Sequence, residues 1–389
     1  MDNVTHTLFA VTLARTPLGR AGRGTTAALI IASNLPDIDI ITTAGGAASY
    51  LKWHRGPTHG PLGIVGLGIA TAALVSLAYR LIPRLRNGGG HSATGDAVSP
   101  PASFAMLTIV SAIGVALHVL MDLPTSYGVR ALSPFSWQWF SADWMPIIDI
   151  YLLIVLVSGL AFGLRSAHAK RWNATIVLTL MAVNYGIRAA AHHQALAAAP
   201  RLMGPTLPQP CDPATMRSGI IDVWPRAPAA MSAMSATSAA SALPPGKRCL
   251  VEIAAIPDFT GPFSWRIIAQ MSNAYEIYQV DLLDERLRAS DTAGDVFWRQ
   301  VRRYPNVWTP VVEQAAESRL GRIFLGFSRF PAARSVVDAQ GNTVVRWTDV
   351  RFVLGVGMSD RPRGGPDMFT ATVRVGPAGE ILDERLGGR

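Results

Sequence analysis

The stretch SFAMLTIVSAIGVALHVLMD, residues 103–122, decides the fold class of this chain. Its first nineteen residues carry no Asp, Glu, Lys or Arg. With a rise of about 1.5 Å per residue, a helix of that length crosses the hydrocarbon core of a bilayer, which is about 30 Å thick. Three further apolar runs are long enough to do the same, and they cover residues 61–83, 146–164 and 172–190. The sequence therefore predicts four transmembrane helices.

Two shorter apolar runs precede these four, at residues 4–14 and 25–41. The first is too short to span a bilayer comfortably, and the second contains Asp37 and Asp39 near its end. We therefore expect re-entrant or short tilted segments here rather than ordinary spans.

The composition supports a membrane protein. Of the 389 residues, 49% are hydrophobic and only 16% are charged, whereas soluble domains are about 25% charged. This excludes intrinsic disorder and disfavours a wholly soluble globule. The net charge of +9 raises nucleic acid as a partner. However, the cations are distributed among the loops and do not form one continuous groove, so we do not expect nucleic-acid binding.

The loop cations predict the orientation of the helices. Nine of them fall on one membrane face, which we expect to be cytoplasmic: Arg15, Arg20, Arg23, Arg80, Arg84, Arg86, Arg165, Lys170 and Arg171. The second face has fewer cations and several tryptophans: Lys52, Arg55, Arg130 and Arg188, with Trp53, Trp137, Trp139 and Trp144. The chain leaves the last helix on this second face, so its remainder is expected outside the cytoplasm, in the periplasm of a Gram-negative cell.

These patterns predict an α+β protein with a polytopic α-helical membrane domain at residues 1–195, a Pro/Ala/Ser-rich linker or insertion at 196–246, and a smaller extracytoplasmic β-rich domain at 247–389. Seven short runs there are predicted as strands: 249–255, 265–271, 275–283, 322–327, 343–347, 351–356 and 369–375. One helix is expected near 311–319. Cys211 and Cys249 are either disulfide-bonded, as an oxidising compartment allows, or two unpaired thiols.

The candidate functional residues are gathered in the apolar half of the chain. Residues 1–200 contain all eight histidines and no glutamate. The predicted topology brings ten polar residues from separate segments near the second face: His6, Asp37, Asp39, His54, Arg55, His59, His118, Asp122, Asp143 and Asp149. Within this set, the spacing of four residues places His118 and Asp122 on the same face of one helix, one turn apart.

Each candidate also has an ordinary structural interpretation. His6 could cap or anchor a helix, and the two aspartates at 37 and 39 could only terminate one. The pair at 118 and 122 could be a hydrogen-bonded pair within a helix, and the aspartates at 143 and 149 could be N-caps. Arg55 could be an interfacial cation. The convergence of so many segments on one face favours a common site.

Several motifs carry a resemblance to a known family. They are Asp2-x-x-Thr5-His6, Asn34-Leu35-Pro36-Asp37-Ile38-Asp39, His54-Arg55-Gly56-x-Thr58-His59, and His118-x-x-x-Asp122 followed by Tyr127-Gly128 and Pro134-Phe135-Ser136. Over roughly residues 1–155 the chain resembles the YdjM-type inner-membrane metal-dependent hydrolases. That family is distantly similar to zinc-dependent phospholipase C and related nucleases. The resemblance implies a metal-dependent hydrolase in the cell inner membrane.

Mixed imidazole and carboxylate donors suit Zn²⁺, with Mn²⁺ or Fe²⁺ as alternatives, and their number allows one or two ions. The predicted ligands are His6, Asp37, Asp39, His54, His59, His118 and Asp122. Arg55, Asp143 and Asp149 are the predicted catalytic residues. The expected partners are membrane lipid and a lipid or small-molecule phosphoester substrate.

The main alternative is a non-catalytic metal-binding membrane protein with an envelope-stress or regulatory role, because the same ligands serve both. A transporter is disfavoured because the sequence shows no internal repeat. A serine hydrolase is disfavoured because the G-x-S-x-G motif is absent. The sequence leaves the oligomeric state open.

Overall fold

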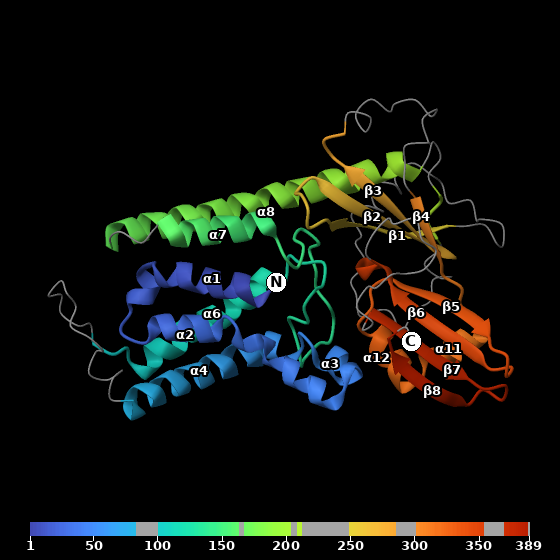
Figure 1. The fold of residues 1–389 in the computed structure, drawn as a ribbon, viewed down its shortest axis with the longest axis horizontal. Helices are drawn as coiled ribbons and strands as arrows, with labels where there is room; N and C mark the ends of the chain where they lie inside the picture. The colour runs from blue at the N-terminus through green and yellow to red at the C-terminus, as the bar shows by residue number, and fades with distance from the viewer. Residues whose placement is uncertain are drawn as a thin grey trace. The chain divides into compact units, whose positions relative to one another are not determined.

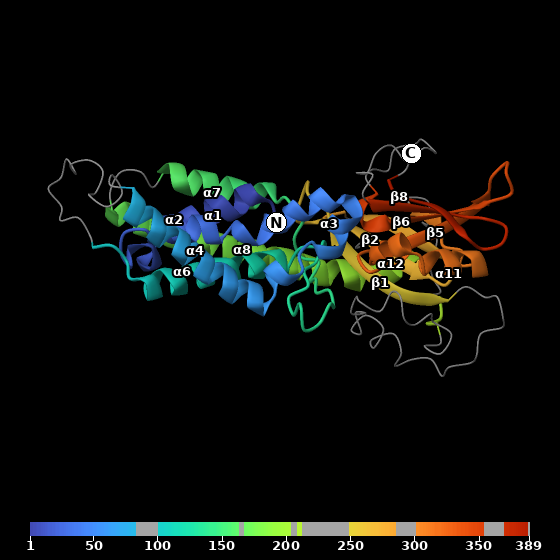
Figure 2. The ribbon, with the colours of Figure 1, turned by 90° about the horizontal axis from the view of Figure 1, so that it is seen from below.

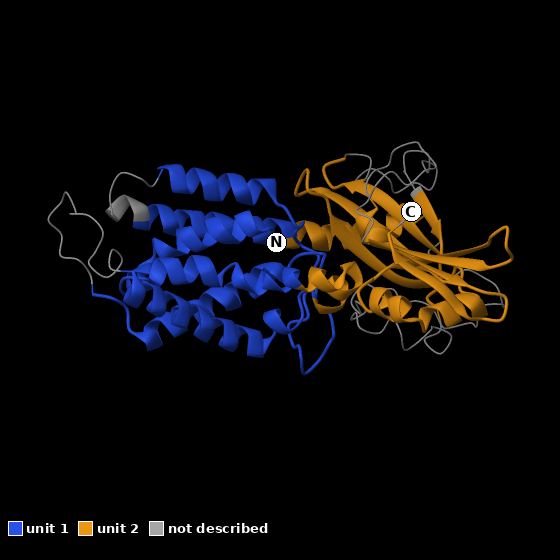
Figure 3. Cartoon of the chain, turned by 60° about the horizontal axis from the view of Figure 1, so that its bottom comes forward, with its two compact units in different colours: residues 1–41, 54–188 blue, residues 42–53, 189–389 orange. Residues whose placement is uncertain are grey.

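The computed structural model describes residues 1–82, 100–162, 167–203, 208–211, 249–284, 301–353 and 369–387. The predicted topogenic cations Arg84, Arg86 and Arg165, and most of the predicted linker, lie outside these residues. The chain forms two compact units (Figure 3). We call Met1–Ile41 with His54–Arg188 the helical unit, and Thr42–Trp53 with Ala189–Arg389 the sheet unit.

Long helices running side by side make up the helical unit (Figure 1). In chain order the helices that contribute to it are α1 (Asn3–Ala14), η1 (Pro17–Arg20), α2 (Thr25–Ala32), η2 (Leu35–Gly45), η3 (Pro57–His59), α4 (Pro61–Leu81), α6 (Phe104–Asp122), α7 (Ile150–Phe162) and the first part of α8 (Ala167–Met203). Side-chain caps explain where two of them begin. Asp2 accepts hydrogen bonds from the Val4 and Thr5 amides at the start of α1, and Ser103 accepts one from the Met106 amide at the start of α6.

Three helices are long and apolar enough to cross a bilayer: α4, α6 and the part of α8 from Arg171 to Met203. The helices predicted at 61–83, 103–121 and 172–190 are therefore confirmed, although α8 extends well beyond its predicted end. The pair α2 and η2 passes the same test together, with a bend of 41° between them, as a broken span or re-entrant loop would have. This agrees with the expectation for residues 25–41.

Helix α7 is shorter than predicted. It covers Ile150–Phe162, 13 residues, in place of the 19 residues expected at 146–164. The difference at its start has a local cause, because a carboxylate oxygen of Asp149 accepts a hydrogen bond of 2.7 Å from the Leu152 amide and so caps the first turn. Residues 163–166 lie outside the described part of the chain.

Small residues let three helices approach closely. A Cβ at Gly68 would lie 3.0 Å from the backbone of Ala112, and one at Gly114 would lie 3.0 Å from the Ala32 side chain. Close contact through small residues is the usual way in which helices associate in membranes. Helices α2, α4 and α6 therefore pack tightly, and this fixes the ends that carry the polar residues described below.

The sheet unit contains two antiparallel four-stranded sheets, each a meander in chain order. The first consists of β1 (Leu250–Pro257), β2 (Ser264–Met271), β3 (Ala274–Asp281) and β4 (Val301–Pro305). Within this unit, one face of α8, with Ala191, Ala195 and Ala199, packs in the same apolar core as Trp265 of β2. Cys211 and Cys249 form a disulfide, which settles the choice that the sequence left open.

The second sheet consists of β5 (Pro331–Val337), β6 (Thr343–Asp349), β7 (Thr370–Val375) and β8 (Ile381–Leu386), and η5 (Val350–Phe352) follows β6. The short helices α11 (Pro310–Ala316) and α12 (Arg319–Leu325) lie against this sheet (Figures 1 and 2). Helix α3 (Ala47–Trp53) also belongs to the sheet unit, where it contacts α12.

Most predicted strand segments are confirmed, but the strand predicted at 322–327 is wrong. Arg319–Leu325 is helix α12, because Ser318 caps its first turn and the buried Leu320, Phe324 and Leu325 recur at helical spacing. Of the run predicted at 351–356, Arg351 and Phe352 lie in η5, and residues 354–356 lie outside the described part of the chain. Strands β4, β5 and β8 were not predicted, and β5 and β8 expose much of their length.

Candidate metal centre

Four of the predicted ligands lie together in the helical unit. Asp37, His59, His118 and Asp122 each offer one donor atom, and these atoms all lie within 4.8 Å of one another. In the described part of the chain, no other group of three or more His, Cys, Asp or Glu residues is arranged in this way. We call these four residues the donor cluster.

Each member of the donor cluster is placed by the end of a helical element. Asp122 is the last residue of α6, and His118 lies one turn before it on the same face. His59 ends η3, two residues before α4 begins, and Asp37 lies in the first turn of η2. The site therefore depends on how α4, α6 and η2 pack, since a shift of any one would separate the donors.

The donor atoms face one another closely. The Nε2 atoms of His59 and His118 are 3.3 Å apart. From Asp122 Oδ2 the distances are 3.6 Å to His59 Nε2 and 3.5 Å to His118 Nε2. From Asp37 Oδ1 they are 3.7 Å and 3.6 Å to the same two nitrogens.

The hydrogen bond on the far side of the His118 ring fixes its tautomer. Its Nδ1 lies 2.8 Å from the carbonyl oxygen of Ser33. A carbonyl can only accept, so Nδ1 carries the hydrogen, and Nε2 of the neutral ring presents its lone pair to the donor cluster. This is the outer hydrogen bond that metal-binding histidines usually make.

His59 is also held for binding. Burial lowers its pKa to about 3, although the nearby Asp37 carboxylate raises it, so the imidazole is neutral at physiological pH. Its Nδ1 lies 3.0 Å from the hydroxyl of Thr58 and 4.0 Å from Asp39 Oδ2. The Nε2 atoms of His59 and His118 thus converge with two carboxylate oxygens.

Asp39 and Arg55 form the layer behind the donors. Asp39 accepts a hydrogen bond of 2.7 Å from the Arg55 amide and lies 3.1 Å from His54 Nδ1. The Arg55 guanidinium lies 3.2 Å from Asp122 Oδ2 and donates to the Gly128 carbonyl at 3.1 Å. Arg55 has a positive φ of 51°, an uncommon conformation for a residue with a side chain, so the surrounding contacts must hold it there.

The second oxygen of Asp122 faces α1. The amino group of Met1 contacts Asp122 Oδ1, and His6 Nε2 lies 3.4 Å from it. The His6 ring is fully buried and stacks on His118 with 3.8 Å between ring centroids. Neither ring nitrogen of His6 makes a hydrogen bond within the described part of the chain. A buried polar group without a partner is costly, which marks this position for a ligand or a charge.

The donor cluster fits a small divalent cation. In tetrahedral zinc sites the bonds are about 2.0–2.2 Å, so neighbouring donors lie about 3.3–3.6 Å apart. Five of the six separations in the donor cluster, those that involve an imidazole nitrogen, are 3.3–3.7 Å and close to that range, and all donor atoms lie within 4.8 Å of one another. Lone pairs that face lone pairs repel, and a cation between them removes the repulsion.

The other predicted site residues lie at increasing distance from the donor cluster. His6, Asp39 and Arg55 contact its members, and His54 contacts Asp39. Burial lowers the pKa of His54. These residues surround the donor cluster and could position its members.

Asp143 and Asp149, predicted as catalytic, are not in the donor cluster. Asp143 accepts a hydrogen bond of 2.6 Å from the Ser141 hydroxyl. Asp149 caps α7 and forms a fully buried ion pair with Arg188 of α8. The N-cap interpretation therefore describes Asp149, and Arg188, which the sequence offered only as a loop cation, is its partner.

Two residues beside Arg55 were not predicted as site residues, although Tyr127 belongs to one of the motifs that carry the family resemblance. The Thr125 hydroxyl lies 3.3 Å from the guanidinium, and the Tyr127 ring centroid lies 4.8 Å from its central carbon. Both lie within five residues after Asp122. The polar residues that directly follow the end of this helix were therefore the sequence signal that could have predicted them. The Ser33 carbonyl had no sequence signal, since any residue supplies one.

Comparisons with known proteins agree with these observations. The protein YfhP of Bacillus subtilis (strain 168), named as uncharacterized, is 26% identical over 134 residues, which cover 34% of this chain and 35% of that protein. The chain thus spans about a third of the length of the curated relative it matches. No solved structure matches. Residues 1–195, half of the chain, match the family described as YdjM inner membrane protein. The chain belongs to the YdjM inner membrane protein family.

Proposed function

We propose that this protein is a metal-dependent hydrolase of the cell inner membrane that acts on a phosphoester of a lipid or lipid-linked molecule. The observation that carries the proposal is the donor cluster, in which two imidazole nitrogens and two carboxylate oxygens lie within 4.8 Å of one another and the two nitrogens are 3.3 Å apart. Zn²⁺ is the proposed ion, because it accepts mixed nitrogen and oxygen donors in this geometry. Mn²⁺ and Fe²⁺ are the alternatives.

The four side chains of the donor cluster differ in exposure, and this difference suggests which of them hold a catalytic ion permanently. The side chains of His59, His118 and Asp122 are 0% exposed, whereas that of Asp37 is 18% exposed. Catalytic zinc sites commonly use three protein ligands and leave one position for water. We assign His59, His118 and Asp122 as the permanent ligands. We place Asp37 at the mouth of the site, where its carboxylate can bind the ion or accept a proton from water.

When bound, the metal would acidify a water molecule and withdraw electrons from the phosphoryl group. The chain supplies the remaining functions. Arg55 brings a guanidinium to within 3.2 Å of Asp122, which suits it to hold a phosphate oxygen beside the donor cluster. Asp39 orients Arg55 through its amide and His59 through Nδ1.

The position of the donor cluster along the helices supports a lipid substrate. Asp122 is the final residue of the apolar helix α6, and His59 directly precedes the apolar helix α4. Ends of spanning helices lie near the headgroup region, which is where the phosphoester of a lipid lies. A lipid could thus present its phosphate while its chains stay in the bilayer.

We further propose that the sheet unit lies outside the cytoplasm. The predicted charge bias of the loops and the Cys211–Cys249 disulfide support this orientation, because disulfides persist in oxidising compartments. Alkaline phosphatase fused after Arg389 should be active in cells, since it folds only after export. An inactive phosphatase with an equally abundant fusion protein would overturn this orientation.

The function is tested by metal content and turnover in the same samples. Full-length protein purified in detergent should retain about one equivalent of a transition metal by mass spectrometry. It should also release phosphate from lipid phosphomonoesters or phosphodiesters supplied in mixed micelles. His193→Ala serves as the matched control, because His193 is an exposed histidine of the sheet unit. Protein that binds no transition metal after reconstitution would end the proposal.

The second candidate is a non-catalytic metal-binding protein with a regulatory role. If all four donors bind the ion at once, no position is left for water. Sites closed in this way are usually structural, which favours this second candidate. Asp37→Ala separates the two. A hydrolase should keep its metal and lose turnover, whereas a closed site should lose its metal.

Asp143 and Asp149 stay predictions as catalytic carboxylates. Asp143→Asn and Asp149→Asn should each abolish turnover without loss of metal if these groups transfer protons. If Asp149 only caps α7 and pairs with Arg188, its replacement should lower thermal stability and leave the turnover of the folded fraction unchanged.

A further inference from the structure

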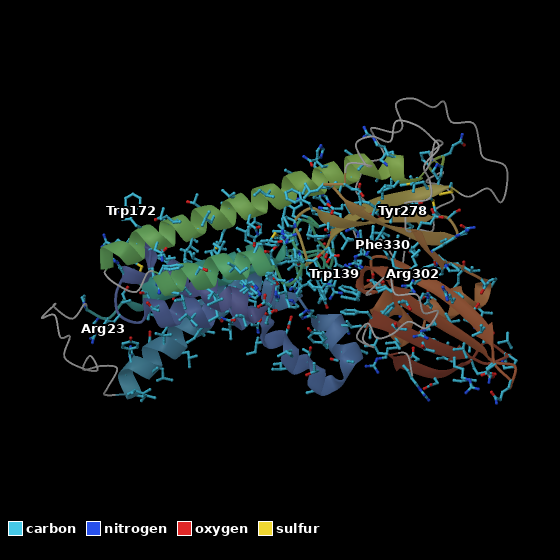
Figure 4. All side chains as sticks on the ribbon, turned by 45° about the horizontal axis from the view of Figure 1, so that its top comes forward. Arg23, Trp139, Trp172, Tyr278, Arg302 and Phe330 are labelled. Carbon is cyan, nitrogen blue, oxygen red and sulfur yellow. A yellow bond between two sulfur atoms is a disulfide. The ribbon has the colours of Figure 1, made fainter. Side chains whose placement is uncertain are left out.

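A cavity of about 740 Å³ opens at the end of the helical unit that lies away from the donor cluster. Its lining includes Arg20, Arg23, Thr26, Ala27 and Tyr79. Figure 4 shows Arg23 and Trp172 near the end of the helical unit that lies away from Trp139. The cavity belongs to the region between η1, α2 and α4, and none of its lining residues is part of the donor cluster.

The two arginines of the cavity differ from their neighbour Arg15. The Arg15 guanidinium donates to the carbonyls of Gly159 and Leu160 and so caps the end of α7. Arg20 makes no hydrogen bond or ion pair with the described residues, and Arg23 Nε is buried without a hydrogen-bond partner among them. Neither Arg20 nor Arg23 forms an ion pair with a carboxylate in the described part of the chain, and both line the cavity.

The backbone of Arg23 is nevertheless rigid. Its amide donates to the Pro100 carbonyl and its carbonyl accepts from the Ala102 amide, both at 3.0 Å. A fixed backbone lowers the entropy lost when the side chain binds a ligand. The first turn of α2 adds partial positive charge, since its N-cap Gly24 offers no side-chain cap and Thr26 and Ala27 line the cavity.

The surroundings suit the headgroup region of a bilayer. Trp172 is 61% exposed near this end of the helical unit, as interfacial tryptophans are, and Tyr79 lines the cavity itself. Many side chains on the outer face of α4 are large, apolar and exposed, among them Leu74, Leu77 and Leu81. These are features of a surface in contact with lipid.

We propose that this cavity binds a phosphate group, and that the phosphate belongs to an anionic phospholipid of the leaflet opposite the donor cluster. Arginine forks match phosphate oxygens in geometry and charge. Basic pockets between membrane helices bind anionic lipid headgroups in the same way. The site is distinct from the proposed hydrolase site and does not depend on it.

The test uses full-length protein in detergent, titrated with phosphatidylglycerol and followed by native mass spectrometry. The wild type should retain one phosphatidylglycerol more tightly than it retains zwitterionic phosphatidylcholine. Arg20→Gln with Arg23→Gln should weaken that binding at least about tenfold, because two charge-assisted hydrogen-bond donors are removed. Arg171→Gln is the matched control, an exposed arginine beside Trp172 outside the cavity lining, and should change binding less than about twofold.

Three outcomes would overturn the proposal. They are unchanged binding by the double variant, an equal loss in Arg171→Gln, and no preference for the anionic lipid. Glycerol 1-phosphate and inorganic phosphate distinguish the source: if either saturates the cavity at concentrations at which the lipid does not bind, the ligand is a soluble phosphate. If the double variant fails to fold, as judged by gel filtration, Arg20→Gln alone gives the same test, because Arg20 is exposed.

Discussion

Buried charges are arranged differently in the two units. In the sheet unit, Arg351 donates to both carboxylate oxygens of Asp349 at 2.7–3.2 Å, and that carboxylate also accepts from the Arg351 amide. In the helical unit, lone pairs of His59 and His118 face carboxylate oxygens of Asp37 and Asp122.

This difference separates buried polar groups that support the fold from those that await a ligand. A carboxylate that is fully hydrogen-bonded to arginine has its charge compensated within the protein and needs no ligand. Acceptors that converge on acceptors are unstable alone, and a cation completes them. Each substitution below changes either the donor cluster or the sheet unit, and the one that is left unchanged serves as the internal reference.

The largest effect is expected from His118→Ala. It removes a donor that faces three others within 3.3–3.6 Å, so metal affinity should fall by at least about a thousandfold. The purified variant should contain no stoichiometric metal by mass spectrometry. Its sheet unit should keep the wild-type β signal in circular dichroism. Retention of a full equivalent of metal would remove His118 from the site.

Asp349→Ala should destabilise the sheet unit by at least about 3 kcal/mol, because the buried guanidinium of Arg351 loses its countercharge. Denaturant unfolding followed by far-UV circular dichroism measures the change. Metal content per folded molecule should stay at the wild-type value. The double variant Asp349→Leu with Arg351→Met should recover much of the loss, since neither charge then remains buried.

Cys211→Ser with Cys249→Ser should cost the sheet unit about 2–4 kcal/mol. The disulfide joins residues 38 apart in sequence, and loss of that link restores freedom to the unfolded chain. Unfolding of the oxidised wild type and of the variant without reductant gives the difference. An equal midpoint for both proteins would show that the bond adds nothing to stability, and the metal content should be identical.

The smallest effect is expected from Asp39→Asn, which should lower metal affinity about tenfold. The amide side chain would keep one acceptor for the Arg55 backbone N–H but lose the negative charge beside His59 and His54. Competition with a fluorescent zinc chelator measures the affinity. Asp143→Asn is the control, since its carboxylate accepts from the Ser141 hydroxyl and the residue lies outside the donor cluster. Equal affinities in the wild type and Asp39→Asn would exclude Asp39 from the supporting layer.

Sequence patterns predicted the long apolar helices well, because length and lack of charge are local properties. They predicted the strand segments less well. The run at 322–327 is apolar enough for a strand, and only the Ser318 cap and the packing of Phe324 make it part of a helix. Similarly, the short extent of α7 depends on Asp149, whose caps and partner cannot be read from hydropathy.

The sequence by itself determined that this protein lies in a membrane and that His59, His118 and Asp122 lie at or beside the ends of apolar runs, because apolar length and residue type are fixed by the chain. Only the tertiary structure decided which of them meet. Asp37, His59, His118 and Asp122 come together because α2, α4 and α6 approach through small residues and because the Ser33 carbonyl turns the His118 ring. Such distances depend on contacts between segments far apart in the chain, which no local pattern encodes.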